Sequence, residues 1–201
     1  MKRIILLFIL HSSLFTLHFT LAQERIRDIY AAAPDSIFPL LTKNNRLDQI
    51  DFRENNMKAE VKNKFDGHSE LLVLSERYLQ LRLSDHCLVE MKLLSDSTFC
   101  MVQTYSAPAP DSRVRLFDTA WHELPQTINR PSVDDFLSED VDIDVRLALQ
   151  ALPLIKASLS ENDDTITFEL QTSELTREQR KLIEGKTRQI VQKVIAGEKR
   201  L

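Results

Sequence analysis

Glycine is scarce in this chain: it occurs at only three of 201 positions, Gly67, Gly185 and Gly197. Loops that hold nucleotide phosphates need several glycines at close spacing, because the backbone must approach the phosphate oxygens. No phosphate-binding loop of either common type can be written with this sequence. The sequence therefore argues against the familiar nucleotide-binding folds, and it predicts no cofactor.

Cysteine is equally scarce, with only Cys87 and Cys100. A tight turn that pairs Leu94 with Ser97 would place Cys100 opposite Met91. Cys87 then lies four residues further along the neighbouring strand, which is about 13 Å at the rise per residue of a strand. A disulfide requires Cα atoms within about 7 Å. Both thiols are therefore expected to remain free.

Motifs for catalysis and metal binding are missing as well. The histidines beyond the N-terminal segment, His68, His86 and His122, occur singly in predicted loops, whereas structural zinc needs four clustered ligands. No serine lies in a Gly-x-Ser-x-Gly motif, and no Cys–His pair suits a nucleophile. The sequence accordingly predicts no catalytic residue and no metal ligand.

Acidic residues gather between Asp134 and Asp144. The run Asp140-Val141-Asp142-Ile143-Asp144 begins like the calcium loop of an EF-hand, but that loop requires glycine at its sixth position and glutamate at its twelfth. This chain has Val145 and Ala151 there. A solvated acidic surface is the main interpretation, and an irregular cation site is the alternative.

The N-terminus has the layout of a cleaved signal peptide. Lys2-Arg3 precede an apolar run, and the small residue Ala22 precedes polar Gln23. A transmembrane anchor needs about 20 mostly apolar residues, whereas histidines, serines and threonines interrupt this stretch. We predict that residues 1–22 are removed and that residues 23–201 form a single α+β domain, periplasmic or secreted, with no membrane span.

The charge balance limits the kind of partner. The formal net charge is −4, and removal of the N-terminal segment makes it more negative because Lys2 and Arg3 are lost without any acidic residue. Nucleic-acid binding depends on a basic surface, so nucleic acid is not expected. A protein or an envelope component is the predicted kind of partner, and the oligomeric state stays open.

What the sequence does contain is a sheet pattern from Ser69 to Asp118. Four or five strand-like segments alternate with short polar turns, as in antiparallel neighbours joined by hairpins: 70–74, 78–83, 87–94, 98–106 and 113–118. Pairing Leu81 with Val89, and Leu83 with Cys87, places the apolar sets of both strands on one face, which fixes the register of a hairpin.

Two helices are predicted before this sheet, at residues 25–33 and at about 44–56. The second would be capped by Asn44 or Asn45, with Leu47 and Ile50 facing inward. Residues 57–65 alternate with period two, which favours a strand, although a helical continuation also fits their spacing.

After the sheet, the sequence predicts a second hairpin from residues 154–160 and 165–172. A helix follows at 176–184 and ends at Gly185. Residues 188–195 fit a last strand, or alternatively a helix. The predicted fold class is therefore α+β: an antiparallel β-meander sheet with N-terminal helices packed on one face and a C-terminal hairpin-helix-strand addition.

One polar cluster is the candidate interaction surface: Asn44, Asn45, Arg46, Asp48 and Asp51. Helical spacing places Asn44, Asp48 and Asp51 near one another. In the structural interpretation an asparagine caps the helix and Arg46 pairs with a nearby acid. In the functional interpretation Arg46 and the carboxylates face a partner. We favour the structural interpretation, because the residue types match a helix start.

Several short stretches resemble a known family: Pro34-Asp35-Ser36, Asn44-Asn45-Arg46-Leu47-Asp48, Asp51-Phe52, Met57-Lys58-Ala59 and the Ser69…Tyr78-Leu79 strands. They look like a family of uncharacterised exported proteins of Bacteroidetes-type bacteria, known as a domain of unknown function. The resemblance spans most of residues 23–201, and its Asn-Asn-Arg-Leu-Asp stretch is the most specific part. It implies a periplasmic or secreted location and brings no established activity.

Together these observations predict an exported soluble protein, most readily a non-enzymatic binding or cell-envelope-associated protein. The alternative is a hydrolase that uses carboxylates without a recognisable motif. A cleft with converging carboxylates would favour the enzyme.

Overall fold

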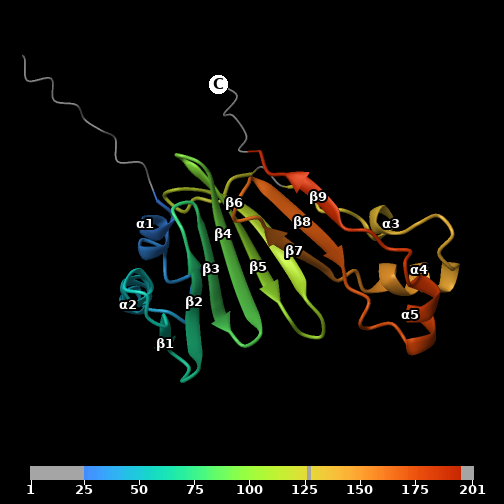
Figure 1. Cartoon of the computed structure of the whole chain (residues 1–201), viewed down its shortest axis with the longest axis horizontal. Helices are drawn as coiled ribbons and strands as arrows, with labels where there is room; N and C mark the ends of the chain where they lie inside the picture. The colour runs from blue at the N-terminus through green and yellow to red at the C-terminus, as the bar shows by residue number, and fades with distance from the viewer. Residues whose placement is uncertain (1–24, 126–127, 196–201) are drawn as a thin grey trace, which may run out of the picture.

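The computed structural model describes residues 25–125 and 128–195. The predicted signal peptide, residues 1–22, lies outside these ranges. The fold is α+β, and its parts form layers: two helices, a six-stranded sheet, a three-stranded sheet, and three further helices beyond it (Figure 1). No helix of the described ranges combines the length and the apolar character needed to cross a membrane.

The large sheet is an antiparallel meander in which every strand pairs with its neighbour in sequence. Its strands are β1 (Glu60–Lys62), β2 (His68–Leu74), β3 (Tyr78–Ser84), β4 (Cys87–Ser95), β5 (Thr98–Tyr105) and β6 (Asp111–Asp118). Because the turns are short, consecutive strands pair side by side. The predicted meander is confirmed.

The β3–β4 register is confirmed at its centre, where Leu81 pairs with Val89. At the turn the prediction was wrong, because Cys87 lies opposite Ser84 instead of Leu83. A register shift between Arg82 and Ser84 absorbs the extra residue, as a β-bulge does.

The predicted pairing of Leu94 with Ser97 was also wrong. Ser95 pairs with Thr98, and a register shift lies between Leu93 and Ser95. A slip of one residue moves a side chain to the other face of a sheet, so this shift changes which face each residue of β5 occupies relative to the prediction.

The two cysteines show the consequence of that shift. Cys100 lies opposite Lys92, not opposite Met91 as predicted. Cys87 belongs to the core on the helix side, whereas Cys100 belongs to the core on the other side. Both are free and buried. The prediction of free thiols is confirmed, and the sheet itself separates them.

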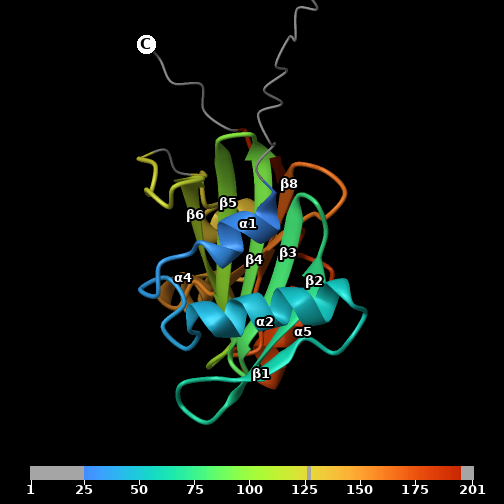
Figure 2. The same ribbon diagram turned by 90° about the vertical axis from the view of Figure 1, so that its left-hand side faces the viewer.

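Helices α1 (Ile26–Ala31) and α2 (Lys43–Glu54) lie across one face of the large sheet (Figure 2). The first turn of α2 differs from the prediction. Thr42 is the cap: its Oγ1 accepts a hydrogen bond from the N–H of Asn45 at 3.1 Å, and Asn45 Oδ1 accepts one from the N–H of Thr42 at 3.0 Å. This capping box starts the helix earlier than a cap at Asn44 or Asn45 would.

The residues of α2 that face the sheet also differ from the prediction. Leu47, predicted to face inward, is 44% exposed, whereas Ile50 is buried as predicted. The remaining inner positions belong to two polar residues, Arg46 and Gln49. The hydrophobic pattern alone could not place them there, because arginine and glutamine are usually exposed.

Residues 57–65 contain a strand, as favoured, but only the three residues of β1 pair with β2. Met57 and Phe65 lie beyond its ends and are 48% and 77% exposed. The hairpin turn holds Asp66 at φ 61°, a left-handed conformation. The side chain of Asn63 stabilises it, since its Oδ1 accepts hydrogen bonds from the N–H groups of Phe65 and Gly67, each at 3.1 Å.

The C-terminal part forms the predicted hairpin-helix-strand addition. Strands β7 (Ile155–Leu159) and β8 (Thr165–Leu170) form the hairpin, α5 (Arg177–Ile183) follows, and β9 (Ile190–Lys193) pairs with β8. Gly185, at φ 74°, follows the end of α5. The strand alternative for residues 188–195 is thereby confirmed.

The small sheet packs on the face of the large sheet opposite α1 and α2 (Figure 1). It therefore buries Glu90 and Lys92, which strand alternation had placed on the polar face of β4. Two side chains of β6 bind the outer edge of β7: Asp111 Oδ1 accepts from the N–H of Ile155 at 3.0 Å, and Ser112 Oγ accepts from the N–H of Ala157 at 2.8 Å. Each sheet thus contributes to a shared interior.

Candidate functional site

The five residues of the predicted interaction surface do not lie on one surface. Asn44, Asp48 and Asp51 are exposed, Asn45 forms the capping box, and Arg46 is only 1% exposed. Their role in binding a partner stays a prediction, which now concerns only the exposed members.

Arg46 binds the segment that connects the two N-terminal helices. Its Nη2 donates to the carbonyl of Ala33 at 2.6 Å, and its Nη1 donates to the carbonyl of Leu41 at 3.3 Å and to Asp35 Oδ1 at 3.2 Å. The hydrogen bond from Arg46 is the main reason why the pKa of Asp35 lies below its ordinary value. Arg46 therefore has a structural role, pairing with a nearby acid.

A series of buried hydrogen bonds beside Arg46 joins α1, α2 and the sheet. Tyr30 Oη donates to Gln49 Oε1 at 2.6 Å, and Gln49 Nε2 donates to the carbonyl of Ser69 at 3.0 Å. Ser69 Oγ in turn donates to the carbonyl of Leu83 at 2.6 Å. Burying a polar group costs free energy unless the group is hydrogen-bonded. These hydrogen bonds hold the two helices on the sheet, and they leave few of these polar groups free to bind a ligand.

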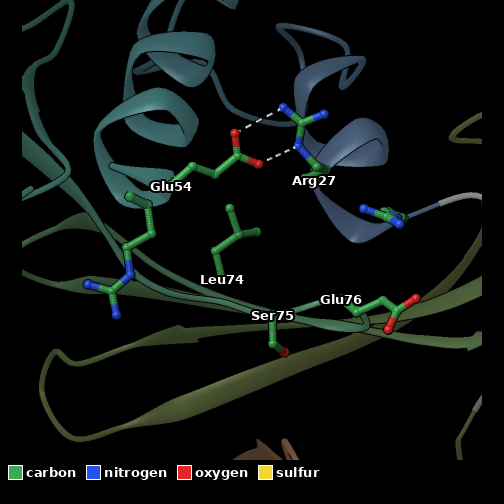
Figure 3. A pocket seen from close by; sticks show the side chains of 7 residues that line it. Arg27, Glu54, Leu74, Ser75 and Glu76 are labelled. Carbon is green, nitrogen blue, oxygen red and sulfur yellow. Dashed lines mark hydrogen bonds and ion pairs between the residues drawn. The ribbon is translucent and has the colours of Figure 1, made fainter. Parts of the chain in front are cut away.

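A surface cavity of about 300 Å³ lies where α1, α2 and the β2–β3 turn meet. We call it the arginine pocket. It is lined by three arginines, two acids and two neutral residues: Arg25, Arg27, Arg53, Glu54, Leu74, Ser75 and Glu76. Figure 3 shows Leu74 projecting between the Arg27–Glu54 pair and the turn that carries Ser75 and Glu76.

Local structure explains how these segments meet. The N–H of Ile26 donates to the carbonyl of Glu76 at 3.2 Å, which joins the start of α1 to the turn. Arg27 and Glu54 then connect α1 to the last turn of α2, with 2.7 Å from Nε to Oε1 and 3.3 Å from Nη2 to Oε2 (Figure 3). An ion pair this exposed adds little stability, but it neutralises Arg27 and fixes its orientation.

Three other charges of the arginine pocket are uncompensated. Within residues 25–125 and 128–195, the side chains of Arg25, Arg53 and Glu76 have no hydrogen bond or ion pair with the protein. Although the net charge of the protein is −4, two guanidinium groups without a partner among the described residues lie at one cavity. Guanidinium groups bind carboxylate and phosphate in a bidentate geometry.

A second cavity, of about 650 Å³, opens on the other side of the β2–β3 turn and shares Ser75 and Glu76 with the arginine pocket. Two of its three cations, Arg77 and Lys92, are bound by the protein. Lys92 Nζ donates to the carbonyl of Glu161 at 2.7 Å, and Arg77 Nη2 donates to the carbonyl of Leu93 at 2.9 Å. The arginine pocket is therefore the better candidate site.

Glu90 is the one buried carboxyl of the described ranges. It lies between the sheets, 4% exposed, with Oε1 accepting from Tyr78 Oη at 2.7 Å and Oε2 without a hydrogen-bond partner. Burial raises the pKa of Glu90, and the hydrogen bond from Tyr78 opposes that rise. Glu90 lines neither cavity.

The acidic stretch from Asp134 to Asp144 is used internally. Asp134 pairs with Arg146, Asp140 pairs with Lys186, and Asp142 Oδ1 caps α4 (Ile143–Ala151). Across the described ranges, no three His, Cys, Asp or Glu side chains are grouped as metal ligands would be. The acids instead hold α4 and the preceding α3 (Val133–Phe136) in position.

Sequence reasoning missed the arginine pocket. Its residues come from three segments, near residues 25–27, 53–54 and 74–76, and no spacing within one segment marks them. Contact between α1 and the β2–β3 turn is set by the tertiary fold. Arg25 and Arg27, which lie three and five residues after Ala22, are the basic residues that a local pattern could have pointed to.

The comparisons with known proteins agree with the fold. The chain is similar to a solved structure described as "Structure of a domain of an uncharacterized protein from Porphyromonas gingivalis W83", a Bacteroidetes protein, with 22% identity, a TM-score of 0.69, and coverage of 83% of this chain and 92% of that one. At this identity the likeness shows the fold alone. No curated protein matches the chain.

The family comparison agrees with the resemblance found in the sequence. The family described as "Protein of unknown function (DUF3256)" matches residues 18–193. That range includes both sheets and all five helices of the described residues, and every residue of the arginine pocket. The chain therefore belongs to this family of unknown function.

Proposed function

We propose that this chain is an exported, non-enzymatic binding protein of the periplasm or cell exterior, and that the arginine pocket is its ligand site. One observation carries the proposal: a cavity lined by the charged side chains of Arg25, Arg53 and Glu76, which have no hydrogen bond or ion pair within residues 25–125 and 128–195. Uncompensated charge at a cavity is what a ligand of opposite charge can use.

The composition of the arginine pocket suits recognition more than catalysis. Its seven lining residues include no histidine or cysteine. Guanidinium groups stay protonated and do not transfer protons at physiological pH, and Glu54 is held by Arg27. A carboxylate-dependent hydrolase would use Glu90, whose raised pKa resembles that of a general acid, but Glu90 lines neither cavity.

Export rests on the N-terminal sequence. The basic pair Lys2-Arg3, the apolar run and Ala22 form a signal-peptide pattern. All described helices and strands follow residue 25, so removal of residues 1–22 would take away none of them. The protein would then meet its ligand outside the cytoplasm.

The export step predicts a defined new terminus. Mass spectrometry of the protein from the periplasmic or extracellular fraction of its native host should find Gln23, or its pyroglutamate, as the first residue. An intact Met1 in that fraction would contradict the predicted cleavage. Cell-lysis markers in the same fraction provide the control for contamination.

The binding function predicts a ligand-dependent rise in melting temperature. Fractions of small molecules from the host periplasm, added to the protein that starts at Gln23, should raise it, because a ligand that binds only the folded state stabilises that state. Arg53→Ala should lose the rise, whereas Arg177→Ala, which removes an exposed arginine of α5, should keep it. A rise that Arg53→Ala retains would exclude the arginine pocket, and no rise with any fraction would contradict the binding function.

A further inference from the structure

The charges of the arginine pocket define a ligand class, and this inference rests on the proposed function. We propose that the arginine pocket binds a small acidic amino acid: a molecule with two carboxylates and one ammonium group, of the size of aspartate or glutamate. Its groups match the uncompensated charges of the pocket one for one.

The two guanidinium groups come from different elements. Arg25 is the residue before α1, and Arg53 belongs to the last turn of α2. Arg27, the third arginine, is already neutralised by Glu54 at 2.7 Å. Two separate guanidinium groups are satisfied by two oxyanions, because each forms its strongest bonds with its own bidentate partner.

The remaining unpaired charge is negative. Glu76 is exposed on the β2–β3 turn and lines the same cavity. A ligand with carboxylates alone would place like charge near Glu76, which is unfavourable. An ammonium group on the ligand turns this repulsion into an attraction. A ligand with two negative charges and one positive charge is therefore complementary to Arg25, Arg53 and Glu76 together.

Size and polarity limit the ligand further. A volume of about 300 Å³ is at the lower end of the range for small-molecule sites, so a large ligand would not fit within it. Leu74 is the apolar residue of the lining, and Figure 3 shows its side chain between the charged groups. One or two methylene groups between the carboxylates would contact Leu74, as in aspartate and glutamate.

Isothermal titration calorimetry of the protein that starts at Gln23 tests the ligand class. The probes are both enantiomers of aspartate and glutamate, glutarate, which lacks the ammonium group, and glutamine, which lacks the second carboxylate. We expect at least one acidic amino acid to bind about tenfold more tightly than glutarate and glutamine, the effect of about one charge-assisted hydrogen bond.

Two variants test which charged residue of the pocket binds which group of the ligand. Glu76→Gln should remove the preference for the acidic amino acid over glutarate, since the ammonium group loses its partner. Arg53→Ala should weaken binding of the acidic amino acid about tenfold and remove its preference over glutamine. Arg177→Ala should bind as the unchanged protein does, and circular dichroism confirms that each variant is folded.

Two results would overturn the inference. In one, glutarate binds as tightly as the acidic amino acids; in the other, none of the probes binds. If the probes fail but periplasmic fractions still raise the melting temperature in an Arg53-dependent way, the ligand class is wrong and the binding function stands. If both experiments fail, the binding function is wrong as well.

Discussion

Replacing Arg46 by alanine is expected to lower the free energy of unfolding by about 3 kcal/mol, the usual cost of leaving buried polar groups without their partner. The substitution removes the donor to the carbonyls of Ala33 and Leu41. It also empties the space of a side chain that is 1% exposed. Urea denaturation followed by circular dichroism measures the change.

Two further variants make this result specific. Asp51→Ala changes an exposed residue of the same helix and should stay within about 0.5 kcal/mol of the unchanged protein. Arg46→Lys keeps the charge but loses the planar fork that reaches two carbonyls, so its stability should lie between the other two. An Arg46→Ala protein as stable as Asp51→Ala would show that the buried contacts contribute nothing.

Replacing Glu90 by glutamine is expected to stabilise the protein at neutral and alkaline pH by about 1 kcal/mol, the scale of an unpaired buried polar group. Burial raises the pKa of Glu90 in the folded state. Between the unfolded and folded pKa values, the folded state binds more protons, so stability falls as the pH rises through that window. Above the window, the unchanged protein holds a buried carboxylate whose Oε2 has no partner.

The gain from Glu90→Gln should therefore disappear at a pH below the unfolded pKa, where the carboxyl is protonated in both states. Melting temperatures measured from acid to alkaline pH show whether it does. Glu178→Gln, an exposed change on α5, should have no such pH dependence. A gain of the same size at every pH would mean that the charge of Glu90 is not the cause.

The large sheet could be predicted because its turns are short and its strands alternate strictly. The errors arose at two of the register shifts in this sheet, near Leu83 and Leu94. The apolar pattern continues through both residues, so nothing in the sequence marks the extra residue. Since strand register has a period of two, one unmarked residue was enough to place Cys100 opposite the wrong partner.

The site was harder to predict than the fold. Pairing of Arg46 with a nearby acid was the favoured interpretation, but its burial was not predicted, because arginine is rarely buried. That burial depends on carbonyl groups of the 33–41 connection that become available only in the folded chain. Similarly, Arg53 and Glu76 line the same cavity only when α2 packs beside the β2–β3 turn. Periodicity reports the faces of single elements and says nothing about where two elements meet.

The contact between β6 and β7 bears on how the protein avoids aggregation. An unpaired strand edge is a template on which another chain can add a strand. Asp111 and Ser112 use side-chain oxygens to bind the N–H groups of Ile155 and Ala157, so the outer edge of β7 has no free donors at these positions. The other edge strand of the small sheet is β9, where another chain could add a strand. This strand has four residues and ends at Lys193. Charge and shortness are the features that protect such an edge, which suits the export that we propose.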